Sequence, residues 1–259
     1  MARQVFTARL VSKQCISDRT QCFHLVFAVD ELDSFDFVPG QFVSTQAEDA
    51  NGKLQTRAYS IASAPRGNQF DLCVNRVEGG FFSNHNCDLE VDETVNFHGP
   101  HGLFLLRKPL TDSIFIATGT GVAPMLGFTQ HLFPENGDDL SEGRDIWMVY
   151  GTRWESELYY REYFESVAAR HPNFHYVATL SRAPEEWKGN RGYVQEQVRR
   201  ILEERAARNH GLPVATVSET PGFDIHAYIC GLNEMVSGNR DQLVAQGWNK
   251  KQVVFERYD

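Results

Sequence analysis

The chain has little of the chemistry that stabilises small secreted or metal-binding proteins. Its five cysteines are scattered along 259 residues, and none forms a C-x-x-C pair. An odd, dispersed set of this kind gives no disulfide framework and disfavours zinc and plant-type iron–sulfur ligation. We therefore expect no metal, and we interpret four of the five cysteines as buried free thiols.

Long apolar runs and an excess of positive charge are also missing. No run approaches the roughly 18 residues that a membrane span needs, and the first residues, MARQVFTARLVSKQ, lack the apolar core of a signal peptide. The net charge of −9 disfavours a nucleic-acid-binding surface. We expect a cytoplasmic protein with no membrane span and no nucleic-acid partner, and a monomer is favoured over an oligomer.

Two patterns of apolar residues divide the chain. As far as about Leu106, short strand-like segments such as CFHLVFAV and FDLCVNRV are separated by Gly, Pro, Asn and Asp, which is typical of an antiparallel barrel or sandwich. From Asp112 onward, apolar runs such as SIFIAT alternate with longer helical stretches, which predicts a parallel sheet with helices on both faces. We expect two domains, residues 1–106 and 107–259, with one short helix in the first that begins at Ser83.

The stretch RAYSIAS (57–63) is interpreted as a short strand between polar loops. Alternation places Arg57 and Tyr59 on one face, and Ala58 and Ser60 on the other. Taken alone, the strand is best interpreted as the edge of a barrel with a tyrosine on its surface.

Two glycine-containing turns are candidates for phosphate binding. In Gly79-Gly80-Phe81-Phe82-Ser83, the serine is expected to cap the short helix and the backbone N–H groups to face an anion, although an ordinary capped turn explains the motif equally well. Gly119-Thr120-Gly121 joins a buried strand to a helix, whose N-terminal N–H groups and dipole favour an anion. Ligands bind at the carboxyl ends of parallel strands, so this second turn is the stronger candidate.

Two further strands end at the same predicted edge. Cys230-Gly231 follows the strand DIHAYICG, and Tyr150-Gly151-Thr152-Arg153 ends another strand. Three turns therefore direct small or polar residues toward one crevice. For Cys230, a buried core position is the alternative.

In this order, the motifs resemble those of the ferredoxin–NADP⁺ reductase family of plant-type flavoprotein reductases. The resemblance covers nearly the whole chain and implies an FAD-binding antiparallel β-barrel followed by an NADP(H)-binding α/β domain. The similar segments are Arg57-x-Tyr59-Ser60 (R-x-Y-S), Gly80-x-x-Ser83 (flavin pyrophosphate), GPHGLF (99–104), Gly119-Thr120-Gly121-x-x-Pro124 (G-T-G-x-x-P) and Cys230-Gly231-x-x-x-Met235 (C-G-x-x-x-M).

The resemblance implies a role for each matching residue of the flavin motifs. Tyr59 would stack on the isoalloxazine ring, and the Ser60 hydroxyl would hydrogen-bond near flavin N5. Arg57 would neutralise the FAD pyrophosphate through a charge-assisted contact. Ala58 would leave room for the flavin, and the turn from Gly80 to Ser83 would hold the same phosphates.

The resemblance also assigns residues to the nicotinamide cofactor. Thr120 and Gly121 would hold its pyrophosphate, while Cys230 and Gly231 would lie beside the nicotinamide ring. Arg153 lies at the same predicted edge, and we expect it to bind the cofactor as well.

A third strand ends in Ser181 and Arg182, which match the family's Ser-Arg pair for the 2′-phosphate of NADPH. Arg191 follows nearby, and Tyr193 would stack on adenine. The segment LSRAPEEWKGNRGYVQE also resembles NADH-dependent cytochrome b5 reductases, which typically have Asp where Ser181 stands. A carboxylate there would repel a phosphate, so Ser181 favours NADPH. The alternative is that Arg182 and Arg191 are solvated loop charges.

Two residues near the end of the chain, in FERYD, also match the family. Glu256 resembles its carboxylate near the flavin, a candidate proton relay. Tyr258 stands where some members place an aromatic ring over the flavin.

These observations predict a ferredoxin/flavodoxin–NADP⁺ reductase. It would exchange hydride between NADP(H) and flavin N5, and single electrons with ferredoxin or flavodoxin, using Ser60, Cys230 and Glu256 as catalytic residues. Arg66, Arg76, Arg107 and Lys108 are candidates for docking the carrier, although single surface charges are more often only solvated. An NADH-dependent flavoprotein reductase that serves an oxygenase or a cytochrome is the alternative. A nucleotide-binding module that has lost catalysis is disfavoured by the presence of the predicted flavin and nicotinamide residues.

Overall fold

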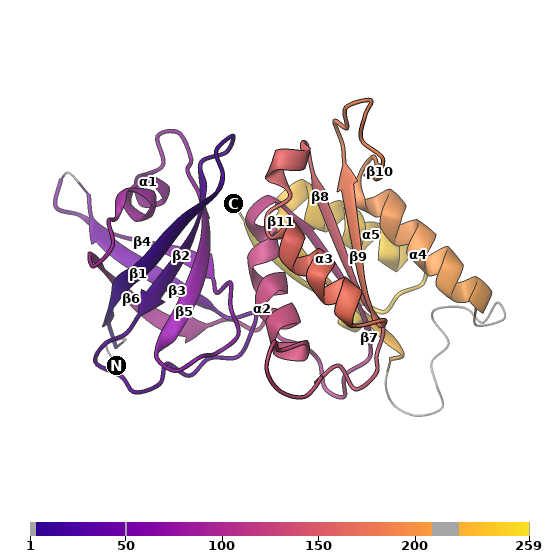
Figure 1. Cartoon of the computed structure of the whole chain (residues 1–259), viewed down its shortest axis with the longest axis horizontal. Helices are drawn as coiled ribbons and strands as arrows, with labels where there is room; N and C mark the ends of the chain where they lie inside the picture. Colours follow the sequence, from indigo (N-terminus) through magenta and orange to yellow (C-terminus); the bar gives the residue numbers. More distant parts are fainter. Residues whose placement is uncertain (1–3, 50, 209–222, 259) are drawn as a thin grey trace. The chain divides into compact units, whose positions relative to one another are not determined.

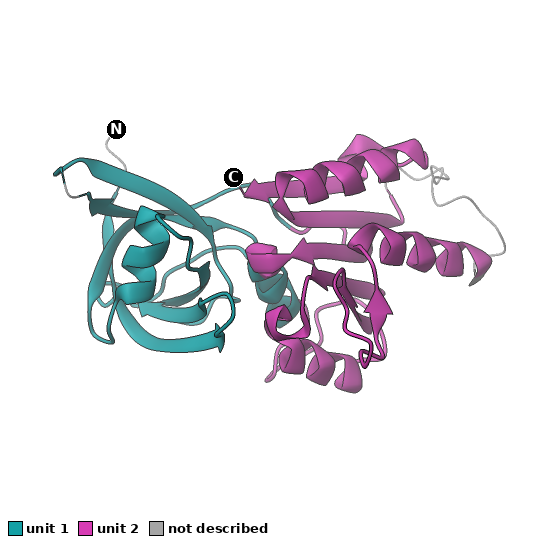
Figure 2. Ribbon diagram, turned by 90° about the horizontal axis from the view of Figure 1, so that it is seen from above, with its two compact units in different colours: residues 1–105, 123–131 teal, residues 106–122, 132–259 magenta. Residues whose placement is uncertain are grey.

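The computed structural model describes residues 4–49, 51–208 and 223–258, which form two compact units (Figure 1). Residues 1–105 and 123–131 make up unit 1, and residues 106–122 and 132–259 make up unit 2 (Figure 2). Most of helix α2 (Val122–Leu132) therefore groups with unit 1.

Unit 1 is built on a six-stranded antiparallel sheet with the order β4-β3-β6-β1-β2-β5. A bridge between Ile61 and Leu72 links the two edges, so the sheet closes on itself. The predicted antiparallel barrel is confirmed. Its elements are β1 (Phe6–Ser17), β2 (Cys22–Ala28), β3 (Phe42–Glu48), β4 (Leu54–Ser60), β5 (Gln69–Asn75), α1 (Phe81–Asp88) and β6 (Thr94–His101).

Aromatic rings fill the inside of this barrel. Phe70 lies centrally, with its ring centroid 5.5 Å from that of Phe27 and 5.1 Å from that of Phe97. All three side chains are fully buried. Alternation along each strand brings these rings to the inner face, and ring pairs at such distances stabilise a core beyond their buried area.

Unit 2 is a six-stranded parallel sheet with the order β10-β9-β8-β7-β11-β12. Its central strands are buried almost throughout, as expected when both faces are covered. This confirms the predicted α/β fold. Its strands are β7 (Asp112–Thr118), β8 (Ile146–Thr152), β9 (Phe174–Leu180), β10 (Asn190–Arg191), β11 (Ile225–Leu232) and β12 (Val253–Tyr258), and its helices are η1 (Gly119–Gly121), η2 (Glu155–Glu157), α3 (Arg161–Arg170), α4 (Val194–Arg208), α5 (Asn233–Ala245) and η3 (Lys250–Gln252).

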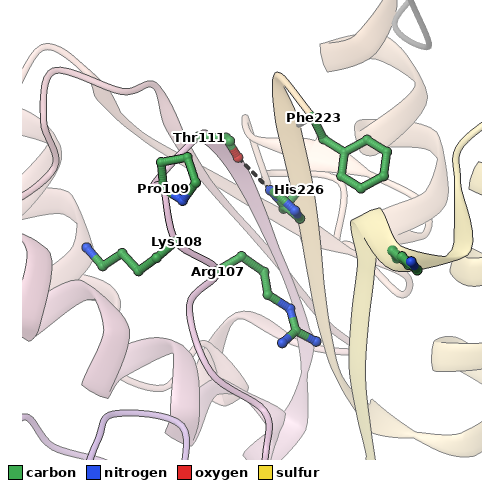
Figure 3. Close-up of a pocket in the computed structure, with 7 residues that line it drawn as sticks. Arg107, Lys108, Pro109, Thr111, Phe223 and His226 are labelled. Carbon is green, nitrogen blue, oxygen red and sulfur yellow. Dashed lines mark hydrogen bonds between the residues drawn. The ribbon is translucent and has the colours of Figure 1, made fainter. Parts of the chain in front are cut away.

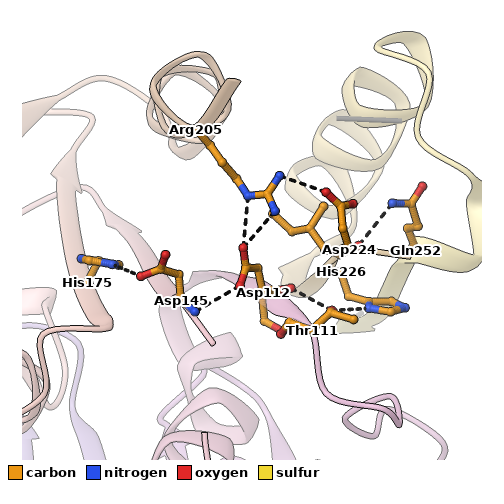
Figure 4. Close-up of polar contacts among 10 residues, drawn as sticks. Thr111, Asp112, Asp145, His175, Arg205, Asp224, His226 and Gln252 are labelled. Carbon is orange, nitrogen blue, oxygen red and sulfur yellow. Dashed lines mark hydrogen bonds and ion pairs between the residues drawn. The ribbon is translucent and has the colours of Figure 1, made fainter. Parts of the chain in front are cut away.

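Helices α4 and α5 share one apolar cluster with the sheet of unit 2. Val198 of α4 and Leu243 of α5 are buried against strand residues such as Ile116. At the amino end of the sheet, Arg205 of α4 lies 2.9 Å from Asp112 and 3.1 Å from Asp224, which ties this helix to β7 and to the segment before β11 (Figure 4). Among the helices described, none has both the length and the apolar character that a membrane span requires.

Candidate cofactor sites

The predicted flavin strand is β4, which pairs with β3. Tyr59 lies opposite Val43, and Ser60 lies opposite Phe42. Arg57 and Ala58 are exposed, while Ser60 is only 6% exposed. The strand therefore presents a cation and a small residue to solvent beside a half-buried aromatic ring.

Tyr59 packs against the barrel core, and its hydroxyl lies beside Asn86 of α1. Burial raises the pKa of Tyr59 to about 12, and the positive charge of Arg57 opposes this shift only in part. The phenol is therefore neutral at physiological pH. Asn86 is fully buried, yet its amide atoms have no hydrogen-bond partner in the described part of the chain.

The glycine turn before α1 differs in detail from the sequence prediction. The helix begins at Phe81 rather than Ser83, and its N-cap residue, Gly80, makes no side-chain cap. The Ser83 hydroxyl instead accepts a hydrogen bond from the Val77 backbone N–H at 3.1 Å. Phe82 is buried and Phe81 is 39% exposed. The helix start is therefore not capped by Ser83, and its first N–H groups are available to an anion.

In unit 2, the predicted dinucleotide turn follows β7. A Cβ added at Gly121 would lie 2.2 Å from the carbonyl oxygen of Cys230, a separation that real Cβ atoms essentially never show. Only glycine lets the turn pack directly on the end of β11. Thr120 is partly exposed in this turn. The Tyr150 hydroxyl, from the neighbouring strand β8, donates a hydrogen bond to the Gly119 carbonyl at 2.9 Å and so holds the turn in place.

A polar atom without a partner lies at the same edge. Thr118 Oγ1 is buried at the carboxyl end of β7 and has no hydrogen-bond partner among the described residues. It would lie 2.7 Å from a Cβ added at Gly231, whose φ of +147° also favours glycine. An unpaired buried hydroxyl is costly, so a ligand group that bonds to it would stabilise the site. This arrangement fits the polar amide of a nicotinamide ring.

Cys230 is fully buried and lies opposite Glu256 in the β11–β12 ladder, two pairs before Leu232 and Tyr258. Burial raises the pKa of the Cys230 thiol, and the charge of Glu256 raises it further. The thiol is therefore neutral near pH 7, which suits packing against a ring and not nucleophilic attack. The structure thus brings together three sequence-predicted residues of unit 2.

Ser181, Arg182 and Arg153 share the carboxyl edge of β8 and β9. The Ser181 backbone N–H bonds to the Thr152 carbonyl at 2.9 Å, and the Arg182 N–H bonds to the Arg153 carbonyl at 3.1 Å. All three side chains are exposed, and neither guanidinium is ion-paired within the described residues. The edge is therefore open to a phosphate. Tyr193 is 67% exposed on the following segment.

Arg191 is placed differently from Ser181 and Arg182. Its guanidinium donates hydrogen bonds to four backbone carbonyls of the preceding loop, at distances from 2.7 to 3.1 Å. These donors hold the loop that follows Arg182. The acceptors belong to Ala183, Pro184, Glu185 and Trp187.

Sequence reasoning missed Thr118 and Asn86, and it placed Tyr150 at the ligand edge without giving it a role. Thr118 immediately precedes the glycine turn, so its position was a usable signal. Tyr150 ends the neighbouring strand but contributes through a long side chain, and Asn86 is an ordinary polar residue in a short helix. Their importance follows only from burial and hydrogen bonding.

Comparison with known proteins agrees with both units. A family model described as an oxidoreductase FAD-binding domain matches residues 7–105, and one described as an oxidoreductase NAD-binding domain matches residues 115–241. The chain is 37% identical to ferredoxin–NADP reductase B from Sorangium cellulosum, covering 98% of each chain. It is 28% identical to the 2-halobenzoate 1,2-dioxygenase electron transfer component from Burkholderia cepacia, covering 99% of this chain and 70% of that protein.

A solved structure shows the same fold. The ferredoxin NADP⁺ reductase from Neisseria gonorrhoeae with bound FAD and NADP superposes with a TM-score of 0.76 at 19% identity, covering 99% of each chain. The fold and the two sites define a flavoprotein oxidoreductase that uses a nicotinamide dinucleotide. Within that class, the chain belongs to the ferredoxin–NADP reductase family.

Proposed function

We propose that the protein prefers NADP(H) to NAD(H) and exchanges single electrons with ferredoxin or flavodoxin. Bound FAD would supply the chemistry that links the two-electron nicotinamide to the one-electron carrier. The observation that carries the cofactor preference is the open edge formed by Ser181, Arg182 and Arg153, with a serine and no carboxylate at position 181.

In unit 1, the residues on β4 would bind and orient FAD. Arg57 would offset the charge of the pyrophosphate, together with the N–H groups at the start of α1. Tyr59 would supply a neutral aromatic face, since burial keeps its hydroxyl protonated. Ser60, buried at the strand end, would offer a hydroxyl to the ring system.

In unit 2, the turn after β7 would hold the nicotinamide dinucleotide. The Thr118 hydroxyl would gain the hydrogen-bond partner that it lacks in the described part of the chain. Cys230 would pack its neutral thiol against the nicotinamide ring and limit the ring's movement. We retain Glu256 as the proposed proton relay and Tyr258 as the proposed cover of the flavin.

Arg191 would act on the cofactor through the loop that it holds. Its hydrogen bonds to four carbonyls fix the segment immediately after Arg182, and a fixed loop orients that guanidinium toward the edge. A direct contact of Arg191 with the 2′-phosphate remains a proposal.

The carrier is proposed from the relatives. Arg66 bonds to buried Asp71 at 2.8 Å, and Arg76 lies 2.7 Å from Asp88, so two of the four candidate docking cations are ion-paired within unit 1. The relatives named ferredoxin–NADP reductase support a ferredoxin as the partner. We further propose a monomer in the cytoplasm, with domains at residues 1–106 and 107–259.

A second candidate is an NADH-dependent reductase of an oxygenase. The similarity to the 2-halobenzoate 1,2-dioxygenase electron transfer component favours it. The two candidates differ in the nicotinamide that they prefer and in the electron acceptor.

The first test is reconstitution. Purified protein is mixed with FAD, excess flavin is removed, and oxidation of NADPH and NADH is measured with an artificial acceptor. We expect a yellow protein that oxidises NADPH in preference to NADH. A protein that stays colourless after reconstitution contradicts the whole proposal, whereas a yellow protein that prefers NADH supports the second candidate.

A further inference from the structure

A pocket with a volume of about 440 Å³ lies in unit 2 at the amino ends of the strands, at the opposite end of the sheet from the dinucleotide turn. The strands of this sheet are about seven residues long, so roughly 20 Å separates the two ends. The pocket is therefore distinct from the cofactor site. The residues that line it are Arg107, Lys108, Pro109, Thr111, Phe223, His226 and Lys251 (Figure 3).

The lining carries positive charge that is largely uncompensated. Arg107, Lys108 and Lys251 contribute three cations, and no carboxylate lines the pocket within the described chain. Lys108 lies 3.6 Å from Glu142, but both side chains are more than half exposed, so this pair is weak. In a protein with a net charge of −9, such a cluster is a local exception.

The nearby carboxylates are already paired elsewhere. Asp112 and Asp224 both bond to Arg205, at 2.9 and 3.1 Å (Figure 4). Arg205 therefore takes up the two acids closest to the pocket along β7 and β11. Within the described residues, the structure gives neither Arg107 nor Lys251 an ion-pair partner.

Two buried polar side chains form the base of the pocket. Thr111 and His226 are 7% and 6% exposed, and Thr111 Oγ1 lies 2.7 Å from His226 Nδ1. The threonine hydroxyl donates to the Asp112 carbonyl at 2.9 Å, so its oxygen accepts the proton of Nδ1. His226 Nε2 then has no partner in the described chain and is available to a ligand.

Charge from the pocket already acts on this histidine. Burial lowers the pKa of His226, the positive charge of Arg107 lowers it further, and the Asp224 carboxylate opposes this in part. Arg107 and His226 both line the pocket and could therefore contact one bound anion. A phosphate group could accept hydrogen bonds from Arg107 and Lys251, and in its singly charged form it could donate its remaining proton to Nε2.

Two apolar residues flank the Thr111–His226 pair. The Phe223 ring meets the His226 ring edge-on, with centroids 5.7 Å apart and planes at 87°. Pro109 also lines this space, and the labelled side chains in Figure 3 show Phe223 and Pro109 flanking the Thr111–His226 pair. A flat ring attached to the anion would find a surface here.

We propose that this pocket binds a small phosphomonoester that carries a ring, with the phosphate at Arg107, Lys251 and His226 and the ring against Phe223. The site is separate from FAD and nicotinamide binding, and its existence does not depend on which dinucleotide the enzyme prefers.

Isothermal titration calorimetry with phenyl phosphate tests the proposal on the full-length, FAD-loaded protein. NADP⁺ is kept in excess, so that the dinucleotide site is occupied and does not compete for phosphate. We expect binding that weakens about tenfold in Arg107→Gln and in Lys251→Gln, as for the loss of one charged hydrogen bond. Both changes are at exposed positions, and the backbone N–H of residue 107 keeps its 2.8 Å bond to Tyr228.

Lys250→Gln is the matched control, because Lys250 is exposed in the same short helix but does not line the pocket. It should bind phenyl phosphate like the wild type. Phe223→Ala should weaken phenyl phosphate and leave inorganic phosphate unchanged. The proposal is overturned if the wild type takes up no phenyl phosphate at about 10 mM, or if Arg107→Gln and Lys251→Gln bind as tightly as Lys250→Gln. Equal loss of both titrants in Phe223→Ala would overturn the assignment of the ring.

Discussion

Gly121 offers the sharpest perturbation of the dinucleotide turn, because its substitution has a calculable geometric effect. The Cβ of Gly121→Ala would lie 2.2 Å from the Cys230 carbonyl oxygen and 2.5 Å from its carbonyl carbon. Cβ contacts essentially never fall below 3.0 Å, so the turn and the end of β11 must move apart. Relieving this clash requires the turn and the strand end to separate by roughly 1 Å, and the close-packed core around them leaves no free space to absorb the added methyl group.

A shift of that size acts on rate as well as on stability. Misplacing a reacting group by about 1 Å costs on the order of a hundredfold in rate, and overpacking costs about 1–3 kcal/mol of stability. We therefore expect Gly121→Ala to slow flavin reduction by NADPH about a hundredfold. The assay is stopped-flow absorbance of the FAD-loaded protein, with thermal unfolding measured alongside.

Gly238→Ala provides the matched control in the same unit. Its Cβ would meet only the end of the flexible Gln195 side chain, at 3.2 Å. Alanine within helix α5 should stabilise the protein by about 0.5–1 kcal/mol, and flavin reduction should keep the wild-type rate. A Gly121→Ala protein that is reduced as fast as Gly238→Ala would refute the reasoning about close approach.

Four further predictions follow from the two sites. Ser181→Asp should lower kcat/KM for NADPH about tenfold through repulsion at an exposed position and leave NADH nearly unchanged; steady-state kinetics with both cofactors measures this, and equal ratios in both proteins would count against the phosphate edge. Arg191→Lys should raise KM for NADPH and NADH alike, because lysine cannot bond to four carbonyls at once; a rise confined to NADPH would indicate a direct phosphate contact instead. Because burial raises the pKa of Cys230, its thiol stays neutral in the folded protein as pH rises through the ordinary thiol range. Its contribution to stability is complete below that range and declines as pH rises from the ordinary thiol pKa toward the raised one, because the unfolded chain ionises first. Iodoacetamide at about pH 8 should modify exposed Cys15 and spare Cys230 by mass spectrometry, and rapid alkylation of Cys230 would contradict its burial. Tyr59→Ala should weaken FAD binding by about 1–3 kcal/mol, as measured by flavin fluorescence on release, and unchanged retention would exclude a stacking role.

The fold was accessible from sequence because each unit has a strong local pattern. Short alternating strands indicate the barrel, and the buried run at β7 followed by a glycine turn indicates the α/β unit. The need for glycine at position 121 could also be anticipated, since a strand-to-helix turn that approaches a phosphate leaves no room for a side chain.

The remaining features depend on contacts that no local pattern encodes. Arg191 holds a loop whose shape is set by four carbonyls, so its guanidinium could not be assigned from spacing. Helix α1 begins at Phe81, two residues earlier than predicted, so Ser83 lies inside the helix. Its hydroxyl accepts a hydrogen bond from the Val77 backbone N–H instead of capping the helix. The pocket at the amino ends of the strands is lined by residues from three separate segments of the chain, which contribute Arg107, His226 and Lys251.

The most direct test of the central claim is stopped-flow reduction of the FAD-loaded protein by NADPH and by NADH, followed by mixing the reduced protein with ferredoxin or flavodoxin. We predict faster reduction by NADPH and rapid reoxidation by at least one of the two carriers. A flavin that neither nicotinamide reduces, or a reduced flavin that neither carrier reoxidises, would contradict the proposed function.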